Sequence, residues 1–192
     1  MDRLLALDQN LLLAINGFDS PFLDFLMIWA SNRWIWIPLY LWMAFLLYRR
    51  IGWIQFAYAL LILVLVIVLT DQTTSSILKP IVARPRPCHV PWLAPVLHLV
   101  NGKCGGPYGF ASSHAANFFG LAVYLTLILR NKPYGLPFLL FGVAFLVAYS
   151  RVYLGVHYPL DVIGGMLIGL FWGGIGFWFF TILRTKRWHS GN

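Results

Sequence analysis

Long uninterrupted apolar runs constrain this chain more than any other feature. The strongest covers residues 54–70, IQFAYALLILVLVIVLT, and carries no charge. Further apolar runs cover residues 34–48, 114–130, 135–150 and 159–183. Each is close to the length that an α-helix needs to cross the hydrocarbon core of a bilayer. Because a segment in lipid must satisfy its own backbone hydrogen bonds, the sequence predicts an all-α, polytopic transmembrane helical bundle with about five spans.

The charge distribution favours a membrane partner over nucleic acid. Only 10% of the residues are charged and the mean hydropathy is +0.75, whereas about a quarter of a soluble domain is charged. The net charge is +8, but the basic residues gather at the ends of the apolar runs and do not line one polar face. We therefore exclude nucleic-acid binding and expect a membrane surface or a phosphorylated membrane lipid as the partner. The size favours a single domain over residues 1–192.

The first thirty residues do not have the pattern of a membrane span. Residues 1–17 mix leucines with Asp2, Arg3 and Asp8, so residues 1–20 are expected to hold an amphipathic helix in the interface. A helix packed on the end of the bundle is the alternative. Residues 21–30 are expected to form a short helix before the first span. The alternative there is one long tilted helix through residue 48.

Basic clusters suggest which way the bundle faces. Alternation of the spans places three clusters on one side: Arg49-Arg50, Arg130 with Lys132, and Arg184 with Lys186 and Arg187. The positive-inside rule makes that side cytoplasmic. Residues 71–113, a polar loop region rich in Pro and Gly, then face outward together with the turn at 151–161. For a bacterial protein this means the inner membrane, with the loop region facing the periplasm.

A stripe of small residues marks the last span. Gly165, Gly169 and Gly173 recur at intervals of four, so they lie on one side of a helix. Such a stripe lets two helices approach closely, and we expect it to serve packing.

Three polar stretches fall at the predicted outer face. They are KPIVARPRP at residues 79–87, GFASSHAAN at 109–117, and RVYLGVHYPLD at 151–161. Together they bring several cations, two histidines, hydroxyls and one carboxylate to one membrane surface. Cations that converge repel each other unless an anion joins them, and the arginine fork matches a phosphate. Each residue alone has an ordinary explanation, but the combination points to phosphoryl transfer.

The third stretch has a geometry suited to that chemistry. Pro159 is tolerated in the first turn of a helix, so the last span can begin directly after His157. Asp161 then lies one turn into the helix, within reach of the imidazole. A carboxylate at one ring nitrogen fixes the tautomer and makes the other nitrogen a better nucleophile.

These stretches resemble the motifs of the type 2 phosphatidic acid phosphatase family. Lys79 is followed after six residues by Arg86-Pro87, which is similar to the first motif. Residues 111–114, Ala-Ser-Ser-His, resemble the second, which usually reads Pro-Ser-Gly-His. Residues 150–161 match the third, in which Ser-Arg is followed by a histidine and an aspartate at the same spacing.

The resemblance implies a role for each matching residue. His157 is expected to attack phosphorus and form a phosphohistidine, Asp161 to orient it, and His114 to protonate the leaving oxygen and then activate water. The phosphate oxygens are expected to be held by Lys79, Arg86, Ser112 and Arg151, with help from the N–H of Ser113. The resemblance implies neither a metal nor another cofactor.

This sequence departs from the family pattern in two places. Ala111 replaces the usual proline, and Ser113 replaces the usual glycine, which leaves the local geometry at Ser113 open. Arg84 is additional to the motif and is expected either to contact a second phosphate or to face water.

Two cysteines, Cys88 and Cys104, both lie in the long polar region. On an outward face they can form a disulfide or remain two free thiols, and the sequence leaves both readings open. Four apolar residues between them are expected to form a short helix that dips into the interface: Trp92, Leu93, Val96 and Leu97.

The resemblance implies a membrane lipid phosphatase, and undecaprenyl diphosphate is the preferred substrate at this point. Lipid A, phosphatidylglycerophosphate and phosphatidate are its rivals, because the motifs bind only the phosphate that these lipids share. The alternative outside enzymes is an anion or lipid transporter. Transporter sites lie near the bilayer midplane, however, whereas here the polar residues gather at one interface.

Overall fold

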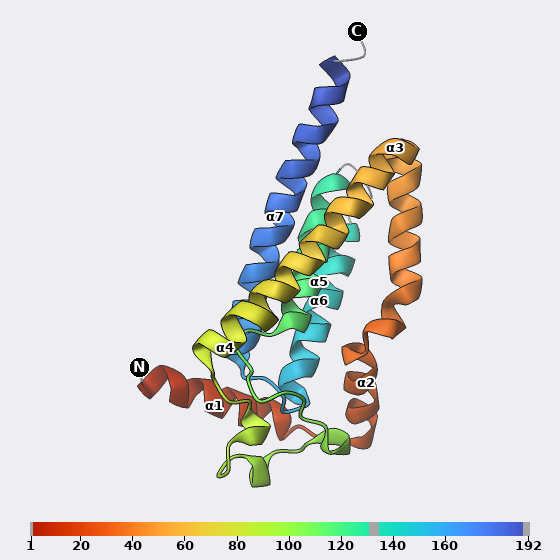
Figure 1. Ribbon diagram of the computed structural model, residues 1–192. Helices are drawn as coiled ribbons and strands as arrows, with labels where there is room; N and C mark the ends of the chain where they lie inside the picture. The colour runs from red at the N-terminus through yellow and green to blue at the C-terminus, as the bar shows by residue number, and fades with distance from the viewer. Residues whose placement is uncertain (1, 131–134, 190–192) are drawn as a thin grey trace.

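The computed structural model describes residues 2–130 and 135–189, and seven α-helices dominate it (Figure 1). Short 3₁₀ turns and one π-helical stretch join them. The described residues form no strand beyond a single bridge between Pro85 and Tyr108, so the predicted all-α class is confirmed. The helices are α1 (Asp2–Asn16), α2 (Pro21–Ser31), α3 (Ile37–Asp71), α4 (Lys79–Val82), α5 (Ser113–Ile128), α6 (Leu136–Tyr153) and α7 (Pro159–His189).

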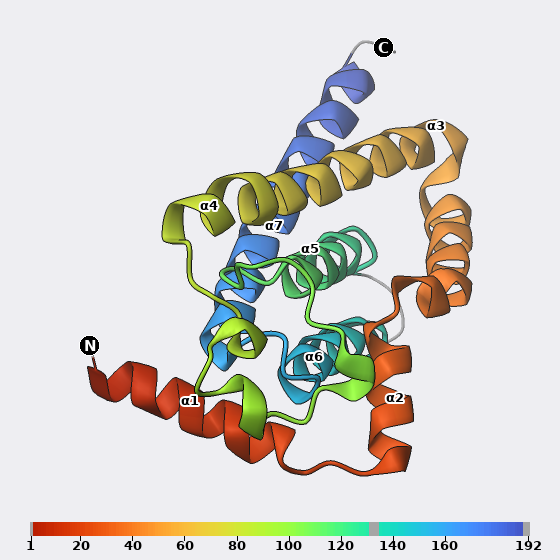
Figure 2. The same cartoon turned by 60° about the horizontal axis from the view of Figure 1, so that its bottom comes forward.

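Gly52 divides α3 into two antiparallel arms. Its φ of 73° lies in the region that favours glycine, and the chain reverses there. Figures 1 and 2 show the two arms spreading apart from this reversal, which lies toward the end of the molecule where the C-terminus lies. Three described segments are long and apolar enough to cross a membrane, residues 33–82, 136–153 and 159–184, and α5 is a shorter apolar helix. The two arms of α3, together with α5, α6 and α7, correspond to the five apolar helical segments that the sequence predicted as spans.

Local capping separates α2 from α3. The Ser20 hydroxyl accepts a hydrogen bond from the N–H of Leu23, and Pro21 occupies the first turn of α2. The Asn32 side chain then accepts from the N–H of Trp34 and starts a 3₁₀ turn at Arg33–Trp36. The predicted short helix is thus confirmed, and one long tilted helix through residue 48 is wrong.

The N-terminal helix lies crosswise to the bundle, at the end that carries the long connection (Figures 1 and 2). It meets α2 at a bend of 116°. Its buried Leu12 packs against Leu93, Leu97 and Val152, while Leu4, with 55% of its surface exposed, points outward. The helix therefore packs on the end of the bundle, as the alternative reading expected, and keeps an apolar face free for an interface.

The long connection starts later than the sequence suggested. Residues 71–82 are helical, because a π-helical stretch at Gln72–Leu78 carries α3 directly into α4. Its wide turn, in which the N–H of Lys79 donates to the carbonyl of Thr74, accommodates Pro80, which lacks an N–H of its own. Ala83, with φ of 47°, ends the helix. The expected loop region at 71–113 is corrected to residues 83–112.

The basic clusters and the polar motifs occupy opposite ends of the bundle. Arg49 and Arg50 lie beside the reversal at Gly52, Arg130 follows α5, and Arg184 lies near the C-terminal end of α7 (Figure 1). Lys132 and the side chains of Lys186 and Arg187 lie outside the described residues. The described members agree with the predicted alternation.

The glycine stripe lies between α5 and α7. A methyl group on Gly165 would overlap the carbonyl of Ser112, and one on Gly169 would overlap the carbonyl of Ala116. Gly173 faces Gly120 and Val123 in the same way. The packing role predicted for the stripe is confirmed, and α7 can lie directly on the backbone of α5.

Gly169→Ala tests this close approach. The new methyl group has no room, so we expect it to push α7 away from α5 and to lower the free energy of unfolding by about 1–3 kcal/mol. Gly174→Ala is the matched control, because a methyl there meets nothing within 4 Å. Thermal unfolding of the detergent-solubilised protein measures both. Equal melting temperatures for the two variants would contradict the packing role.

Candidate active site

The three polar stretches meet at one end of the bundle. Lys79 lies on α4, and its ammonium donates to the hydroxyl of Ser113 at the start of α5 over 2.9 Å. The N–H of Ser112 donates to the backbone carbonyl of Asp161 on α7 over 2.9 Å. Arg86, from the connection, approaches His157 with 3.4 Å between Nη1 and Nε2. His114 and Arg151 lie close enough for their charges to act on His157 and on each other. All eight residues expected in the site therefore gather at this end, although they span 83 positions from Lys79 to Asp161.

His157 sits in the tight turn between α6 and α7. Gly155, with φ of 69°, makes the turn, and Pro159 begins α7. The imidazole is almost completely buried, and its Nδ1 lies 3.4 Å from Oδ2 of Asp161. The same oxygen accepts a hydrogen bond from the N–H of Tyr158 over 3.1 Å. The expected histidine–aspartate pair is therefore in place, with Nε2 directed toward Arg86.

Burial is the main reason that the His157 imidazole resists protonation. Burial, followed by the charges of Arg86, Arg151 and Lys79, holds the pKa of this imidazole well below its ordinary value. The ring is therefore neutral at neutral pH. A neutral ring keeps the lone pair that a nucleophile needs.

Arg86 is held rigidly by the connection. Its Nε donates to the carbonyl of Tyr108 over 3.1 Å, and its Nη1 donates to the carbonyls of Cys104 and Val156 over 3.3 and 3.4 Å. The residue is buried, and burial lowers the pKa of its guanidinium. A cation fixed in this way is pre-organised for an anion.

Three buried polar atoms of the expected site residues lack hydrogen-bond partners. Within the described parts of the chain, the hydroxyl of Ser112, Nε of Arg151 and Nδ1 of His157 make no hydrogen bond, so the 3.4 Å approach of Nδ1 to Asp161 is a close polar contact. The other side of the Arg151 guanidinium donates from Nη1 to the hydroxyl of Ser31 on α2. Ser112 is the N-cap residue of α5, yet its side chain makes no cap hydrogen bond. Free donors next to a helix N-terminus suit an oxyanion.

Ser113 replaces the usual glycine of the motif and anchors Lys79. Its hydroxyl also lies 2.8 Å from that of Thr74 and 2.9 Å from that of Ser75. Lys79 in turn lies within 3.4 Å of the Ser75 hydroxyl, one turn away on the same helix. Neither Thr74 nor Ser75 was predicted from the sequence. The i−4 spacing of Ser75 from Lys79 was a signal that could have found it, whereas Thr74 at i−5 is brought into place by the π-helical stretch.

Arg84 does not play either expected role. Its Nη1 lies 2.8 Å from Oδ1 of Asp161, and its Nη2 lies 2.6 Å from Oδ2 of Asp8. The guanidinium is therefore committed to two carboxylates and neither faces open water nor reaches toward a second phosphate. The partner Asp8, on α1, was not predicted, because no local spacing links it to the motifs.

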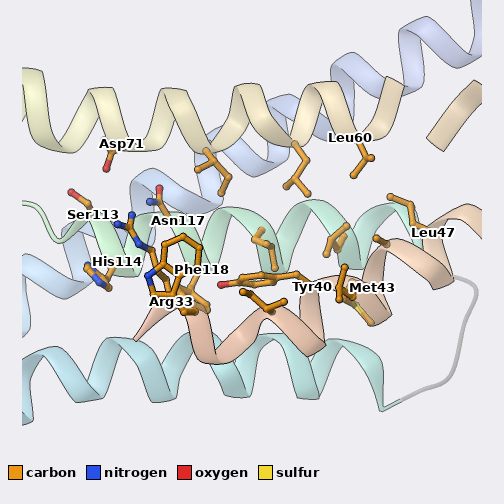
Figure 3. A pocket seen from close by; sticks show the side chains of 18 residues that line it. Arg33, Tyr40, Met43, Leu47, Leu60, Asp71, Ser113, His114, Asn117 and Phe118 are labelled. Atoms are coloured by element: carbon orange, nitrogen blue, oxygen red, sulfur yellow. The ribbon is translucent and has the colours of Figure 1, made fainter. Parts of the chain in front are cut away.

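An apolar cleft of about 590 Å³ opens beside His114 (Figure 3). It lies between the two arms of α3 and α5. Arg33, Ser113 and His114 gather at one end, and Leu47 and Leu60 lie at the other (Figure 3). Neither the cleft nor the place of Arg33 was predicted from the sequence, because no local pattern indicates a cavity between the two arms of α3.

The structure joins Cys88 and Cys104 in a disulfide, which decides between the two readings left open by the sequence. Between them, Leu93 and Leu97 are buried in a cluster with Leu12 of α1, whereas Trp92 and Val96 are exposed. Of these four residues only Val96 lies in a helical turn, the 3₁₀ turn Ala94–Val96. Among the described residues, Cys88, His89 and Cys104 are the one group with the spacing of metal ligands, and the disulfide occupies two of its sulfurs.

Comparisons with known proteins agree with this geometry. The profile described as the PAP2 superfamily matches residues 55–185. The chain is 37% identical to a lipid A 4'-phosphatase of Bacteroides thetaiotaomicron over 94% of this chain and 78% of that protein. It is 35% identical to the undecaprenyl-diphosphatase BcrC of Bacillus subtilis over 39% of this chain and 37% of that protein.

A solved structure shares the fold. The transmembrane PAP2-type phosphatidylglycerolphosphate phosphatase of Bacillus subtilis superposes with a TM-score of 0.67, covering 97% of this chain and 88% of that one, at 21% identity. The likeness supports an integral membrane protein built on the same helical architecture.

Ser113→Ala tests whether the serine hydroxyl positions the Lys79 ammonium for phosphate binding. Loss of one hydrogen bond to the ammonium costs about 1 kcal/mol, so we expect the Kd for inorganic phosphate to rise about fivefold. Isothermal titration calorimetry measures the binding. Ser76→Ala is the control, because that exposed hydroxyl bonds only Gln72. An unchanged Kd in Ser113→Ala would show that Lys79 does not depend on the serine.

Proposed function

This chain belongs to the PAP2 superfamily, and from that premise we propose that it is an integral membrane phosphatase that removes a phosphate group from a lipid. The main observation that supports this proposal is that His157, His114 and three cations converge at the end of the bundle where the apolar cleft opens. The chemistry needs a nucleophile, a proton donor, an anion cradle and a place for a lipid tail. One short region of the molecule supplies all four.

The proposed reaction has two steps. Nε2 of His157 attacks the phosphorus atom in line, a nitrogen–phosphorus bond forms, and the bond from phosphorus to the leaving oxygen breaks while His114 gives that oxygen a proton. Asp161 holds the imidazole at Nδ1. Water then attacks the phosphohistidine, His114 takes the proton from the water, and phosphate leaves as the nitrogen–phosphorus bond breaks. The chain needs no other reactant than the ester and water.

The cradle explains how the phosphate is held. Its dianion would lie among the side chains of Lys79, Arg86 and Arg151, and its oxygens would accept from the hydroxyl of Ser112 and from the α5 N-terminus. The unpartnered Ser112 hydroxyl and Arg151 Nε support this placement. Charge development in the transition state then meets donors that are already fixed.

His114 connects the chemistry with the cleft. It is the proposed proton donor to the leaving oxygen, and it also lines the apolar cleft (Figure 3). The leaving group is the lipid part of the substrate, so we place its tail between the arms of α3 and α5. Leu47, Leu60 and Leu63 provide the apolar surface there.

A lipid A-type phosphate monoester is the substrate that we propose first. The lipid A 4'-phosphatase of Bacteroides thetaiotaomicron resembles 94% of this chain, including the N-terminal region. The sequence alone placed undecaprenyl diphosphate first and lipid A among its rivals, and the extent of this similarity reverses that order in our proposal.

Undecaprenyl diphosphate remains the second candidate because of Arg33. This cation lines the cleft at the same end as His114, the proposed proton donor to the leaving group (Figure 3). A diphosphate would place its second phosphate there, where a guanidinium can bind it.

The polarity of the bundle supports an outward-facing site. The described basic residues Arg49, Arg50, Arg130 and Arg184 lie at the end opposite to the site, and positive clusters are typical of the cytoplasmic side. We therefore place the site at the periplasmic face of a bacterial inner membrane, with residues 1–192 acting as one domain and α1 lying in the interface.

His157→Ala tests the proposed nucleophile. We expect phosphate release from the preferred lipid to fall at least about a thousandfold, because the covalent route is lost. The assay measures free phosphate from lipid A, undecaprenyl diphosphate, phosphatidylglycerophosphate and phosphatidate, each in detergent with EDTA. His89→Ala, a change at an exposed histidine, is the control. Undiminished release by His157→Ala would rule out this nucleophile, and hydrolysis of none of the four lipids by the wild type would overturn the function.

Ala44→Phe tests the place of the lipid tail. Ala44 lines the cleft on the first arm of α3, so a phenyl ring there fills it. We expect hydrolysis of the long-chain lipid to fall about tenfold or more, whereas that of water-soluble para-nitrophenyl phosphate stays unchanged, because only the tail contact is lost. Ala57→Phe, on the exposed side of the second arm, is the control. A parallel loss with both substrates would place the tail elsewhere.

A further inference from the structure

A buried group of three charges lies directly behind the proposed catalytic pair. Arg84 bridges Asp8 of α1 and Asp161 of α7, at 2.6 and 2.8 Å. The two carboxylate side chains are 1% and 0% exposed, and that of Arg84 is 18% exposed. Breaking a buried ion group by removing one member leaves an uncompensated charge, so the three residues act as a unit.

Asp8 and Arg84 together frame the turn that carries His157. Oδ1 of Asp8 accepts a hydrogen bond from the N–H of Leu160 over 2.8 Å, at the start of α7. The Arg84 guanidinium lies 3.9 Å from the centre of the Tyr158 ring, next to His157. The contacts therefore reach the residues on both sides of the pair formed by His157 and Asp161.

The charges in this group sum to −1, because one guanidinium faces two carboxylates. This is the local negative charge that opposes the cations around His157. The titratable and charged groups that face His157 are Arg86 from the connection, Lys79 from α4, His114 from α5, Arg151 from α6, and Asp161 from α7 with its partners Arg84 and Asp8. Without Asp8 the positive charge of Arg84 would fall wholly on Asp161.

We propose that Asp8 is a positioning residue of the active site, which acts through Arg84 to keep Asp161 an effective anionic partner of His157. The inference rests on the proposed function, since it takes His157 as the nucleophile. It also assigns a task to α1, which lies outside residues 55–185 matched by the PAP2 superfamily profile.

A charge-balance experiment separates this role from simple packing. Asp8→Asn changes the sum from −1 to 0, and Asp8→Asn combined with Arg84→Gln returns it to −1. If Asp8 acts through charge, the His157 imidazole has the same pKa in the double variant as in the wild type. If the residues only hold α1 in place, each lost contact adds to the disturbance. The pKa of His157 in the double variant then differs more from the wild-type value than it does in the single variant.

The readout is the pKa of the His157 imidazole. It is followed by ¹⁵N NMR on histidine-labelled protein in detergent with saturating inorganic phosphate, and the signal is assigned by its loss in His157→Gln. Asp8→Asn removes negative charge, which destabilises the imidazolium, so the pKa should fall by about half a unit or more. The double variant should return to the wild-type value. Asp19→Asn, an exposed aspartate on the same segment, should not change it.

The turnover number supplies the second readout. In Asp8→Asn we expect it to fall about tenfold at unchanged KM, because the nucleophile is weakened while the cradle is intact. The inference would be overturned by an unchanged His157 pKa in Asp8→Asn. It would also be overturned if the His157 pKa of the double variant lay further from the wild-type value than that of the single variant. If Asp8→Asn does not fold, the double variant decides alone, because a wild-type pKa supports the inference and a displaced pKa overturns it.

Failure of the proposed function gives a different result. In that case the wild type releases no phosphate from any lipid, or His157→Ala remains active. A fully active wild type and an inactive His157→Ala, together with an unshifted pKa in Asp8→Asn, would refute the inference alone.

Discussion

A neutral imidazole enclosed by cations is the arrangement on which the rest of this site depends. His157 is almost completely buried, and Arg86, Arg151 and Lys79 all lower the pKa of its ring. In an apolar bundle such a cluster of like charges is costly, because neighbouring cations repel each other and burial removes water from them. A phosphate dianion would relieve the repulsion between these cations, and this supports the proposed role of the cluster as the phosphate site. The neutral ring is at the same time the form that the proposed attack on phosphorus requires.

The close contact between α5 and α7 makes that cluster possible. Gly165 faces the carbonyl of Ser112 with no room for a side chain, and the N–H of Ser112 donates to the carbonyl of Asp161. The glycine stripe therefore also determines how the second and third motifs are positioned relative to each other. The glycines bring the backbone of α7 onto the start of α5, and this approach places His114 and His157 at the same end of the bundle. Larger side chains between the two helices would move His114, the proposed proton donor, away from His157, the proposed nucleophile.

The sequence predicted those parts of the molecule that depend on local spacing. The pair of His157 and Asp161 follows from an i, i+4 relation with Pro159 between them, and the reversal near Gly52 follows from a break between two apolar runs. The parts that it missed depend on contacts between distant residues. Arg84 meets Asp8 across 76 positions, and no periodicity encodes that pairing. The helical start of the long connection was hidden because Pro80 signals a helix end, whereas a π-helical turn accommodates it.

The third motif is also held in place by residues that precede the family match. Asn16 donates to the carbonyl of Tyr153 over 2.6 Å, Asp24 accepts from the Tyr153 hydroxyl over 2.8 Å, and Ser31 accepts from Arg151. These contacts fix the end of α6, from which the turn to His157 departs. Arg33 follows directly and lines the cleft at the end where His114 lies (Figure 3). The proposed phosphate site thus lies within the residues matched by the PAP2 superfamily profile, while the N-terminal segment contacts the end of α6 and lines the cleft proposed for the lipid. Discrimination between lipids that share the same phosphate has to arise on the leaving-group side, because the cradle sees only what they have in common.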